Sequence, residues 1–208
     1  MAQICIIDYG MGNIHSVAKA LNKVSSKNDK IKIANNFKDI HSSDKIVFPG
    51  QGAAQTCMNN LNKNFDIDQF KSIISQKPFL GICMGLQVLM NNSDEENTQC
   101  LGIFTGDVKR ISSINNTRIK LPHMGWSKVD YTKKGQMWNN IENNSYFYFV
   151  HSYYVSPKNS EDIMSYTEYG ARFPSSLYKE NIIAVQFHPE KSSKNGLIFL
   201  KNFINWRI

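Results

Sequence analysis

Hydrophobic positions in the first half of the chain alternate between short continuous runs and stretches with a helical period. Continuous apolar runs indicate buried strands, whereas apolar residues spaced three and four apart indicate one buried face of a helix. The predicted strands are Gln3–Asp8, Ile31–Ala34, Lys45–Phe48 and Phe79–Ile82, and the predicted helices are Asn13–Val24, Ala53–Leu61 and Ile67–Ser75. Because strands that alternate with helices form βα units, this half predicts an α/β fold with a mostly parallel open sheet and helices on both faces.

The hydrophobic period changes to two from about Thr105 onward, and aromatic and β-branched residues become frequent. The segments with this period are Val108–Ile111, Trp126–Tyr131, Tyr146–Val155 and Met164–Tyr169. They predict antiparallel strands that flank or extend the sheet. A last strand at Ile182–Phe187 precedes a helix at Ser192–Trp206. Since no linker or repeat divides the sequence, we expect a single domain over residues 1–208.

Composition and charge narrow the classes of protein that fit this pattern. Hydrophobic residues make up 41% and charged residues 20% of the chain, as in ordinary globular proteins. The net charge is +7, but the basic residues are scattered, so we expect no nucleic-acid partner. No apolar run approaches the roughly 20 residues that span a bilayer, so we expect no membrane insertion. Four widely spaced cysteines without a secretory leader predict reduced thiols and a cytoplasmic location.

No phosphate-binding motif is complete. The run Gly10-Met11-Gly12 begins like a dinucleotide fingerprint, but His15 stands at the third glycine position. A tight turn between a strand and a helix accounts for this run equally well, and no P-loop sequence occurs. We therefore expect no cofactor, and we predict no metal ligands.

The run Gly81-Ile82-Cys83-Met84-Gly85 has the form of a nucleophile elbow, in which a sharp turn between a strand and a helix exposes the central side chain. The N-terminus of the following helix favours a thiolate, and its free N–H groups can face an oxyanion. Cysteines in apolar surroundings are also common core residues. Taken alone, the run fits a nucleophile and a buried core cysteine about equally well.

A candidate general base follows about a hundred residues later, at His188-Pro189-Glu190. In an extended segment, residues two apart point to the same side, so Glu190 can orient the His188 imidazole. A lone His-x-Glu also fits an exposed strand end. Together with Cys83, however, it predicts a Cys-His-Glu triad, the arrangement that activates a thiol for acyl transfer.

The run Val47–Gly52 ends a predicted strand with two glycines on either side of Gln51. Gly50 and Gly52 leave the backbone N–H groups of this loop unobstructed. Together with the N–H of Met84, they could complete an oxyanion hole. The alternative is a plain turn between a strand and a helix.

Considered together, these motifs resemble the class I glutamine amidotransferases, a flavodoxin-like α/β family, and among them most closely the glutaminase subunits of imidazole glycerol phosphate synthase. The resemblance covers nearly the whole chain and implies one glutamine amidotransferase type 1 domain over residues 1–208. The matching segments are Asp8–Asn13, Phe48–Gly52, Gly81–Gln87, Pro122–Trp126, Phe149–Tyr153 and Gln186–Ser193.

The resemblance implies that Cys83 attacks the side-chain amide of glutamine, that His188 transfers protons and that Glu190 orients His188. Ammonia leaves, and water then hydrolyses the thioester. The family match gives further residues a role in binding the oxyanion or the substrate, namely Gly50, Gln51, Gly52, Met84, Gln87, Glu95, His151, Ser152 and Tyr153.

The same resemblance implies a (β/α)-barrel cyclase subunit as partner in a heterodimer. In the family, ammonia passes through this partner, which forms imidazole glycerol phosphate and the aminoimidazole carboxamide nucleotide in histidine biosynthesis. Asn13, Trp126 and Tyr148 resemble partner-facing positions. For Trp126 and Tyr148, packing at the end of the sheet is an equally good interpretation.

The sequence departs from the family pattern at three places. Gln51 stands where Val is most frequent, Cys83 is followed by Met-Gly-Leu instead of Leu-Gly-Met, and Ser127 stands where Asn is usual. The departure at Gln51 concerns how strongly glutaminase activity depends on the partner, and the departure at Ser127 raises a question about the partner surface. Three other hypotheses stay open: a paralogous amidotransferase that feeds another acceptor, a catalytically silent regulatory partner, and a secreted cysteine protease.

Overall fold

The first half of the chain folds into alternating strands and helices, as its hydrophobic pattern predicts. The computed structural model describes residues 2–111, 119–133 and 135–208. The elements of this half are β1 (Gln3–Ile7), α1 (Ile14–Val24), β2 (Lys30–Ala34), α2 (Phe37–His41), β3 (Lys45–Gly50), α3 (Ala54–Asn64), α4 (Ile67–Ile74), β4 (Phe79–Cys83) and α5 (Met84–Gln87). Every strand and helix predicted in this half is present, and α2 is a short additional helix.

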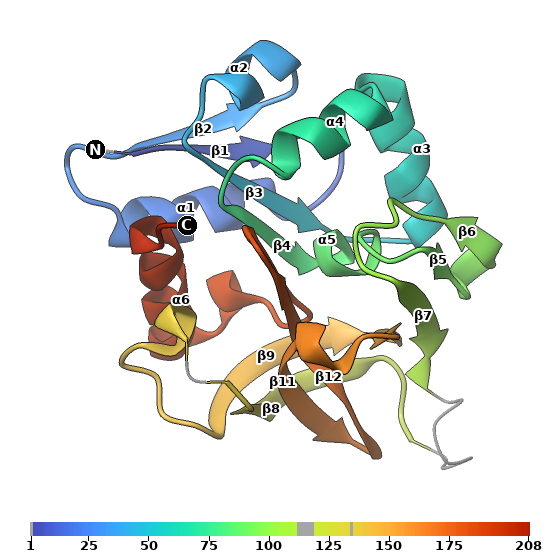
Figure 1. Ribbon diagram of the computed structural model, residues 1–208. Coiled ribbons are helices and arrows are strands. Elements are labelled where there is room, and N and C mark those ends of the chain that lie inside the picture. Colours follow the sequence, from blue (N-terminus) through green and yellow to red (C-terminus); the bar gives the residue numbers. More distant parts are fainter. Residues whose placement is uncertain (1, 112–118, 134) are drawn as a thin grey trace.

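The main sheet joins this half to most of the later strands (Figure 1). The later elements are β8 (His123–Tyr131), β9 (Ser145–His151), β11 (Ile163–Tyr169), β12 (Ala171–Lys179), β13 (Ile182–Val185) and the helix α6 (Ser193–Asn205). The strand order is β2-β1-β3-β4-β13-β12-β11-β8-β9, parallel from β2 to β13 and antiparallel from there on. The predicted α/β fold, with a parallel first half and antiparallel later strands, is confirmed.

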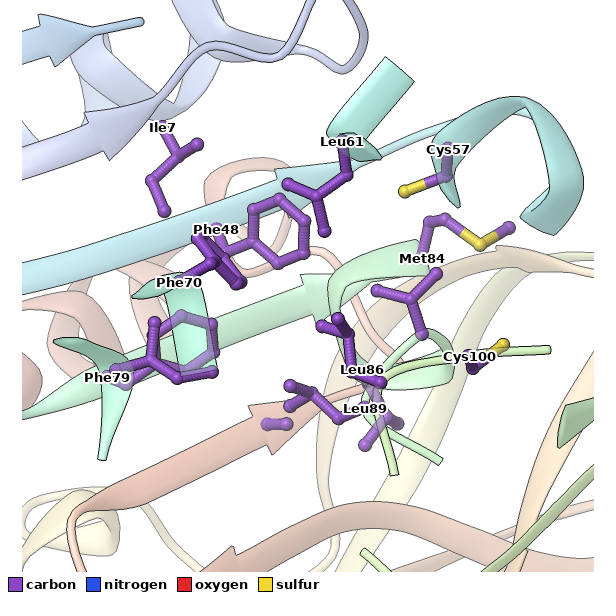
Figure 2. Close-up of a cluster of buried hydrophobic side chains, with 14 of the residues drawn as sticks. Ile7, Phe48, Cys57, Leu61, Phe70, Phe79, Met84, Leu86, Leu89 and Cys100 are labelled. Carbon is purple, nitrogen blue, oxygen red and sulfur yellow. The ribbon is translucent and has the colours of Figure 1, made fainter. Parts of the chain in front are cut away.

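Helices cover both faces of the parallel part of the sheet. Successive side chains of a strand point to opposite faces, so Ile6 and Ile7 of β1 belong to different cores. Ile6 packs in the core that includes Phe199 of α6, whereas Ile7 packs in the core that includes Phe48 and Phe70, shown in Figure 2. The continuous apolar runs of β1, β3 and β4 follow from this burial on two faces.

A second, smaller sheet has the order β10-β7-β5-β6. Its strands are β5 (Asn92–Ser93), β6 (Thr98–Gln99), β7 (Gly106–Arg110) and β10 (Tyr153–Pro157). The antiparallel structure predicted for Tyr146–Val155 is present, but it is divided between two strands, because the chain leaves the main sheet after His151 and enters the second sheet at Tyr153. The junction between the two sheets lies at these residues.

The strand β12 is missing from the predicted elements because its pattern is not that of an ordinary half-buried strand. It contains Pro174, which normally argues against a central strand, and the buried serines Ser175 and Ser176. The Ser165 hydroxyl of β11 lies 2.9 Å and 2.5 Å from the hydroxyls of these two serines. Hydrogen bonds between serines thus replace the apolar contacts that would reveal the strand from its sequence.

Four short 3₁₀ helices complete the described elements. They are η1 (Glu95–Asn97), η3 (Gln136–Trp138), η4 (Ser160–Asp162) and η5 (Pro189–Lys191). In the part of the chain that the structure describes, no helix is long and apolar enough to cross a membrane.

Candidate active site

Cys83 is the last residue of β4, and its backbone is strained. Its φ of 55° and ψ of −105° lie in a region that residues with a side chain rarely adopt. The neighbouring glycines allow this turn to pack closely: a Cβ at Gly81 would lie 2.5 Å from the carbonyl oxygen of Gly85, and one at Gly85 would lie 2.1 Å from that of Phe48. The two glycines are thus required for the sharp turn at Cys83.

The helix that follows the elbow is shorter than the sequence pattern suggests. It comprises the four residues Met84–Gln87. The sequence argument that a helix N-terminus favours the thiolate is therefore weakened, because a single turn carries fewer aligned peptide dipoles than a full helix.

The Gly50–Gly52 loop lies directly against this elbow. In the parallel register of β3 and β4, Gly50 is the partner of Cys83. A Cβ on Gly50 would lie 2.6 Å from the Met84 Cβ and 2.9 Å from the backbone nitrogen of Gly85. Gly52 adopts a φ of 91°, which glycine allows without strain. The loop therefore needs glycine at Gly50 so that it can lie close to Met84 and Gly85, and at Gly52 so that the backbone can adopt a positive φ.

His188 and Glu190 form a buried hydrogen-bonded pair. The Nδ1 atom of His188 lies 2.8 Å from Glu190 Oε1, and both side chains are almost fully buried. The predicted extended segment is wrong here, because β13 ends at Val185 and Glu190 lies in the 3₁₀ turn η5. This turn, rather than strand alternation, brings the carboxylate to the imidazole.

The charge state of His188 depends on its two neighbours. Burial disfavours the imidazolium, but the Coulombic effect of Cys83, together with the charge of Glu190 and its hydrogen bond, outweighs burial and raises the pKa of His188. Since Nδ1 faces Glu190, Nε2 is the nitrogen available for proton transfer, and it has no conventional hydrogen-bond partner among the described residues. Catalytic hydrogen bonds are often long before substrate binds.

A cavity of about 420 Å³ brings most of the predicted site residues together. Its walls are formed by Gln51, Gly52, Cys83, Met84, Gln87, Glu95, Pro122, Val150, His151, Ser152, Tyr153, His188 and Lys191. Of the residues predicted for catalysis, oxyanion binding or substrate binding, Gly50 and Glu190 are the ones outside this wall. Both lie in contact with wall residues, Gly50 with Met84 and Glu190 with His188.

The cavity also involves residues to which sequence analysis gave no role. Pro122, Val150 and Lys191 line it, and Gln186 lies just behind it. Gln186 is fully buried and donates a hydrogen bond from Nε2 to the Cys83 sulfur at 3.6 Å. A glutamine at the end of an apolar strand, two residues before His188, was the signal that could have revealed it.

The side chains of Glu95 and Gln87, both predicted to bind substrate, have protein partners. Glu95 Oε2 accepts a hydrogen bond from the backbone N–H of Ala54, at the start of α3. Gln87 donates from Nε2 to the Tyr153 carbonyl and to Gln186 Oε1, each at 3.1 Å. Both side chains are therefore held in position before any substrate is bound.

The predicted partner-facing residues do not line the cavity. Trp126 of β8 and Tyr148 of β9 are cross-strand partners, with ring centroids 6.0 Å apart in an edge-to-face arrangement. The Trp126 side chain is 50% exposed, so packing against Tyr148 alone does not explain why a tryptophan stands at this position. Asn13 immediately precedes α1 and is half-buried.

A strained cysteine beside a buried histidine–glutamate pair, at the carboxyl edge of a parallel sheet, is typical of cysteine-dependent acyl-transfer enzymes. Solved structures share this fold. The fold matches a crystal structure of a glutamine amidotransferase with a TM-score of 0.71 at 14% identity, covering 96% of this chain and 98% of the other. It matches PurLQS from Thermotoga maritima with a TM-score of 0.71 at 14% identity, covering 99% of each chain. At such identities the likeness shows the fold alone.

The sequence itself identifies the family. Residues 5–206 match the family Glutamine amidotransferase class-I. The chain is 48% identical to the imidazole glycerol phosphate synthase subunit HisH of Hydrogenovibrio crunogenus, covering 98% of this chain and 96% of that protein. It is 45% identical to the HisH subunit of Acinetobacter baylyi over the full length of both. The chain therefore belongs to the class-I glutamine amidotransferases and, within them, to the HisH glutaminase subunits of imidazole glycerol phosphate synthase.

Proposed function

We propose that this glutaminase subunit of histidine biosynthesis uses Cys83, His188 and Glu190 to hydrolyse glutamine, and that it delivers the ammonia to a (β/α)-barrel cyclase subunit. The observation that carries the catalytic part is the strained Cys83 in one cavity with His188, whose other ring nitrogen is held by Glu190 at 2.8 Å. This arrangement provides a nucleophile, a base and a group that orients the base.

The first half of the reaction forms a thioester. His188 Nε2 takes the proton of the Cys83 thiol, and the sulfur attacks the side-chain amide carbon of glutamine. The resulting oxyanion collapses as His188 returns the proton to the amide nitrogen, and ammonia leaves. Glu190 stabilises the imidazolium that exists between these two proton transfers.

The second half regenerates the enzyme. His188 removes a proton from water, the hydroxide attacks the thioester, and a second oxyanion forms. Its collapse releases glutamate, and His188 returns the proton to the Cys83 sulfur. The sum of the two halves is glutamine and water giving glutamate and ammonia.

Both oxyanions need donors beside the Cys83 sulfur. We assign this role to the backbone N–H groups of Met84 and of the Gly50–Gly52 loop, because Gly50 lies opposite Cys83 in the strand register. One such donor typically contributes about 2.7 to 4 kcal/mol to the transition state. Because the donor belongs to the backbone, glutamine in place of valine at Gln51 is compatible with this role.

The exposed apolar residues of β8 and β9 support a partner surface. Met124, Trp126 and Tyr146 are 62%, 50% and 51% exposed. Exposed large apolar side chains that lie together are typical of surfaces that bind another protein. We assign docking of the cyclase subunit to this surface, with Tyr148 and Asn13 as further contacts. The four cysteines are all free thiols, which supports a reducing, cytoplasmic location.

The decisive experiment uses Cys83→Ala in complex with the cyclase subunit of the same organism. Glutamine hydrolysis should disappear, while cyclase activity with added ammonium should remain. If the variant still hydrolyses glutamine in the complex, the nucleophile is assigned wrongly. If the wild-type pair fails to rescue a histidine auxotroph while glutaminase activity persists, the ammonia serves another acceptor.

A further inference from the structure

The side chain of Gln87 is held so that one particular atom stays free. Its Nε2 group donates one hydrogen bond to the Tyr153 carbonyl and one to Gln186 Oε1. A carbonyl oxygen only accepts hydrogen bonds, so the nitrogen and not the oxygen of the amide must face Tyr153. The remaining polar atom, Gln87 Oε1, is buried without a hydrogen-bond partner among the described residues. Gln87 also lines the cavity beside Cys83.

The Tyr153 carbonyl is itself fixed by a pair of buried histidines. His151 Nδ1 lies 2.7 Å from this carbonyl and must therefore carry a proton. Burial lowers the pKa of His151 to about 3, so the ring is neutral and its Nε2 is an acceptor. His123 Nδ1 lies 3.0 Å from that Nε2 and must be the donor.

The far end of this chain lies on β8. Burial lowers the pKa of His123 to about 4, so its Nε2 is also an acceptor, and it lies 2.8 Å from the Ser127 hydroxyl. The His123 ring is stacked between Tyr169 and Phe149, at 4.1 Å and 4.9 Å between centroids. The direction of every hydrogen bond from Ser127 to Tyr153 is thereby determined, and the two stacked rings restrain the His123 imidazole.

Gln186 supports the other side of the same amide. Its Oε1 accepts from Gln87, so its Nε2 must point the opposite way, where it donates to the Cys83 sulfur at 3.6 Å. The side chain is fully buried, and Gln186 lies two residues before His188 in the chain. Gln186 thus contacts both the Cys83 sulfur and the Gln87 amide, which lines the cavity.

We propose that Gln186 and the His123–His151 pair are positioning residues, which fix the Gln87 amide in the wall of the cavity and leave Oε1 as its unused acceptor for an N–H group of the substrate. Gln186 additionally orients the Cys83 sulfur and stabilises its anion. This inference rests on the proposed glutaminase function. It assigns roles to two residues, Gln186 and His123, for which sequence analysis gave none.

The test distinguishes the role of Gln186 from that of the His123–His151 pair by measuring two quantities, KM for glutamine and the alkylation rate of Cys83. Wild type and variants are assembled with the cyclase subunit, and kcat and KM for glutamine are measured. The rate at which iodoacetamide alkylates Cys83 is measured on the same complexes, since this reagent needs the thiolate but not the Gln87 acceptor. Circular dichroism and a thermal melt show which variants are folded.

His123→Phe keeps the stacked ring but removes both hydrogen bonds. We expect KM to rise about five-fold, as for loss of one hydrogen bond, with kcat and the alkylation rate within two-fold of wild type. His123→Asn loses the stacked ring but keeps a donor near the position of Nδ1, and it should restore KM. Tyr169→Phe is the matched control, because it keeps the stack and the chain of hydrogen bonds, and it should leave all three quantities unchanged.

Gln186→Met removes both hydrogen bonds of that side chain and should raise KM and also slow alkylation, each by about five-fold. Gln186→Glu keeps the acceptor for Gln87 and removes the donor to sulfur, so it should slow alkylation while leaving KM near wild type. If one of the two variants does not fold, the alkylation rate of the other still tests whether Gln186 stabilises the Cys83 thiolate.

Unchanged KM in folded His123→Phe and unchanged alkylation in the folded Gln186 variants would overturn the inference. So would a KM increase in His123→Phe that folded His123→Asn fails to reverse, because the lost hydrogen-bond donor to His151 would then not be its cause. If folded wild type hydrolyses no glutamine with its partner, the proposed function is wrong instead.

Discussion

Gly50 in β3 and Cys83 in β4 are direct partners in the parallel register of the main sheet. This pairing places the glycine loop beside the nucleophile before any partner or substrate is present. A side chain at Gly50 would collide with the Cβ of Met84 and with the backbone of Gly85. Glycine at position 50 therefore allows the Gly50–Gly52 loop to lie as close as it does to Met84 and Gly85 of the elbow.

Gly50→Ala should reduce kcat for glutamine at least ten-fold in the complex, because the loop must move away from the elbow and the oxyanion donors separate. Removal of one such donor costs roughly a hundred-fold or more in other acyl-transfer enzymes. Gly135→Ala is the matched control, since a Cβ there has no atom within 4 Å. Steady-state glutaminase assays measure both variants, and wild-type activity in folded Gly50→Ala would contradict the role of close approach.

Iodoacetamide should label Cys83 selectively in the native protein. Burial raises the pKa of Cys5 and Cys57 to about 12 and that of Cys100 to about 11, so these thiols stay protonated, whereas Cys83 lines the cavity. Peptide mass spectrometry after timed alkylation should show Cys83 modified at least ten times faster than the others.

Glutamine should slow this labelling, and unfolding in urea should make all four cysteines react alike. Labelling of another cysteine as fast as Cys83 in the native protein would show that access to the elbow has been assigned wrongly.

The sequence predicted the parallel half of the fold well because burial on two faces leaves continuous apolar runs in β1, β3 and β4. It failed where polar groups or turns replace that signal. Ser175 and Ser176 conceal β12, and a 3₁₀ turn, not a strand, carries Glu190. The junction at Ser152, where the chain changes sheets, has no hydrophobic signature because aromatic residues continue on both sides.

The candidate site was predictable where a motif specifies local geometry, as at Cys83 and His188. Its supports were not, because the roles of Gln186 and His123 depend on contacts between residues far apart in sequence. Ser127 illustrates the difference. Its departure from the family pattern raised a question about the partner surface, whereas its hydroxyl lies 2.8 Å from the buried His123.

Glu190→Gln should abolish most glutaminase activity and also change the pH dependence of stability above neutrality. His188 has a raised pKa in the folded state, so its contribution to stability is fully present below the ordinary histidine pKa of about 6.5. That contribution is lost as the pH rises through the folded-state value. Glu190→Gln removes one of the charges that raise this pKa and should flatten the decline.

The free energy of unfolding, measured in urea from pH 6.5 to 9.5, checks this for wild type, Glu190→Gln and the exposed-residue control Glu142→Gln. The control should decline as wild type does. An equally steep decline in Glu190→Gln would show that Glu190 does not stabilise the His188 imidazolium.

His123→Phe should make the free energy of unfolding less sensitive to pH on the acid side of neutrality. The pKa values of His123 and His151 are lowered to about 4 and about 3 by burial, so between these values and about 6.5 the unfolded chain binds more protons than the folded one. Stability must then fall as the pH falls through this window, by up to about 1.4 kcal/mol per pH unit for each histidine.

Replacing one of the two histidines should therefore reduce the slope of the free energy of unfolding between pH 4.5 and 6 by up to that amount, with Tyr169→Phe as the control. Carboxyl groups contribute to the wild-type slope as well, and the difference between His123→Phe and the control isolates the imidazole. An unchanged slope would mean that His123 is charged in the folded protein. It could then not accept from Ser127, and the direction of the hydrogen bonds leading to Tyr153 would be undefined.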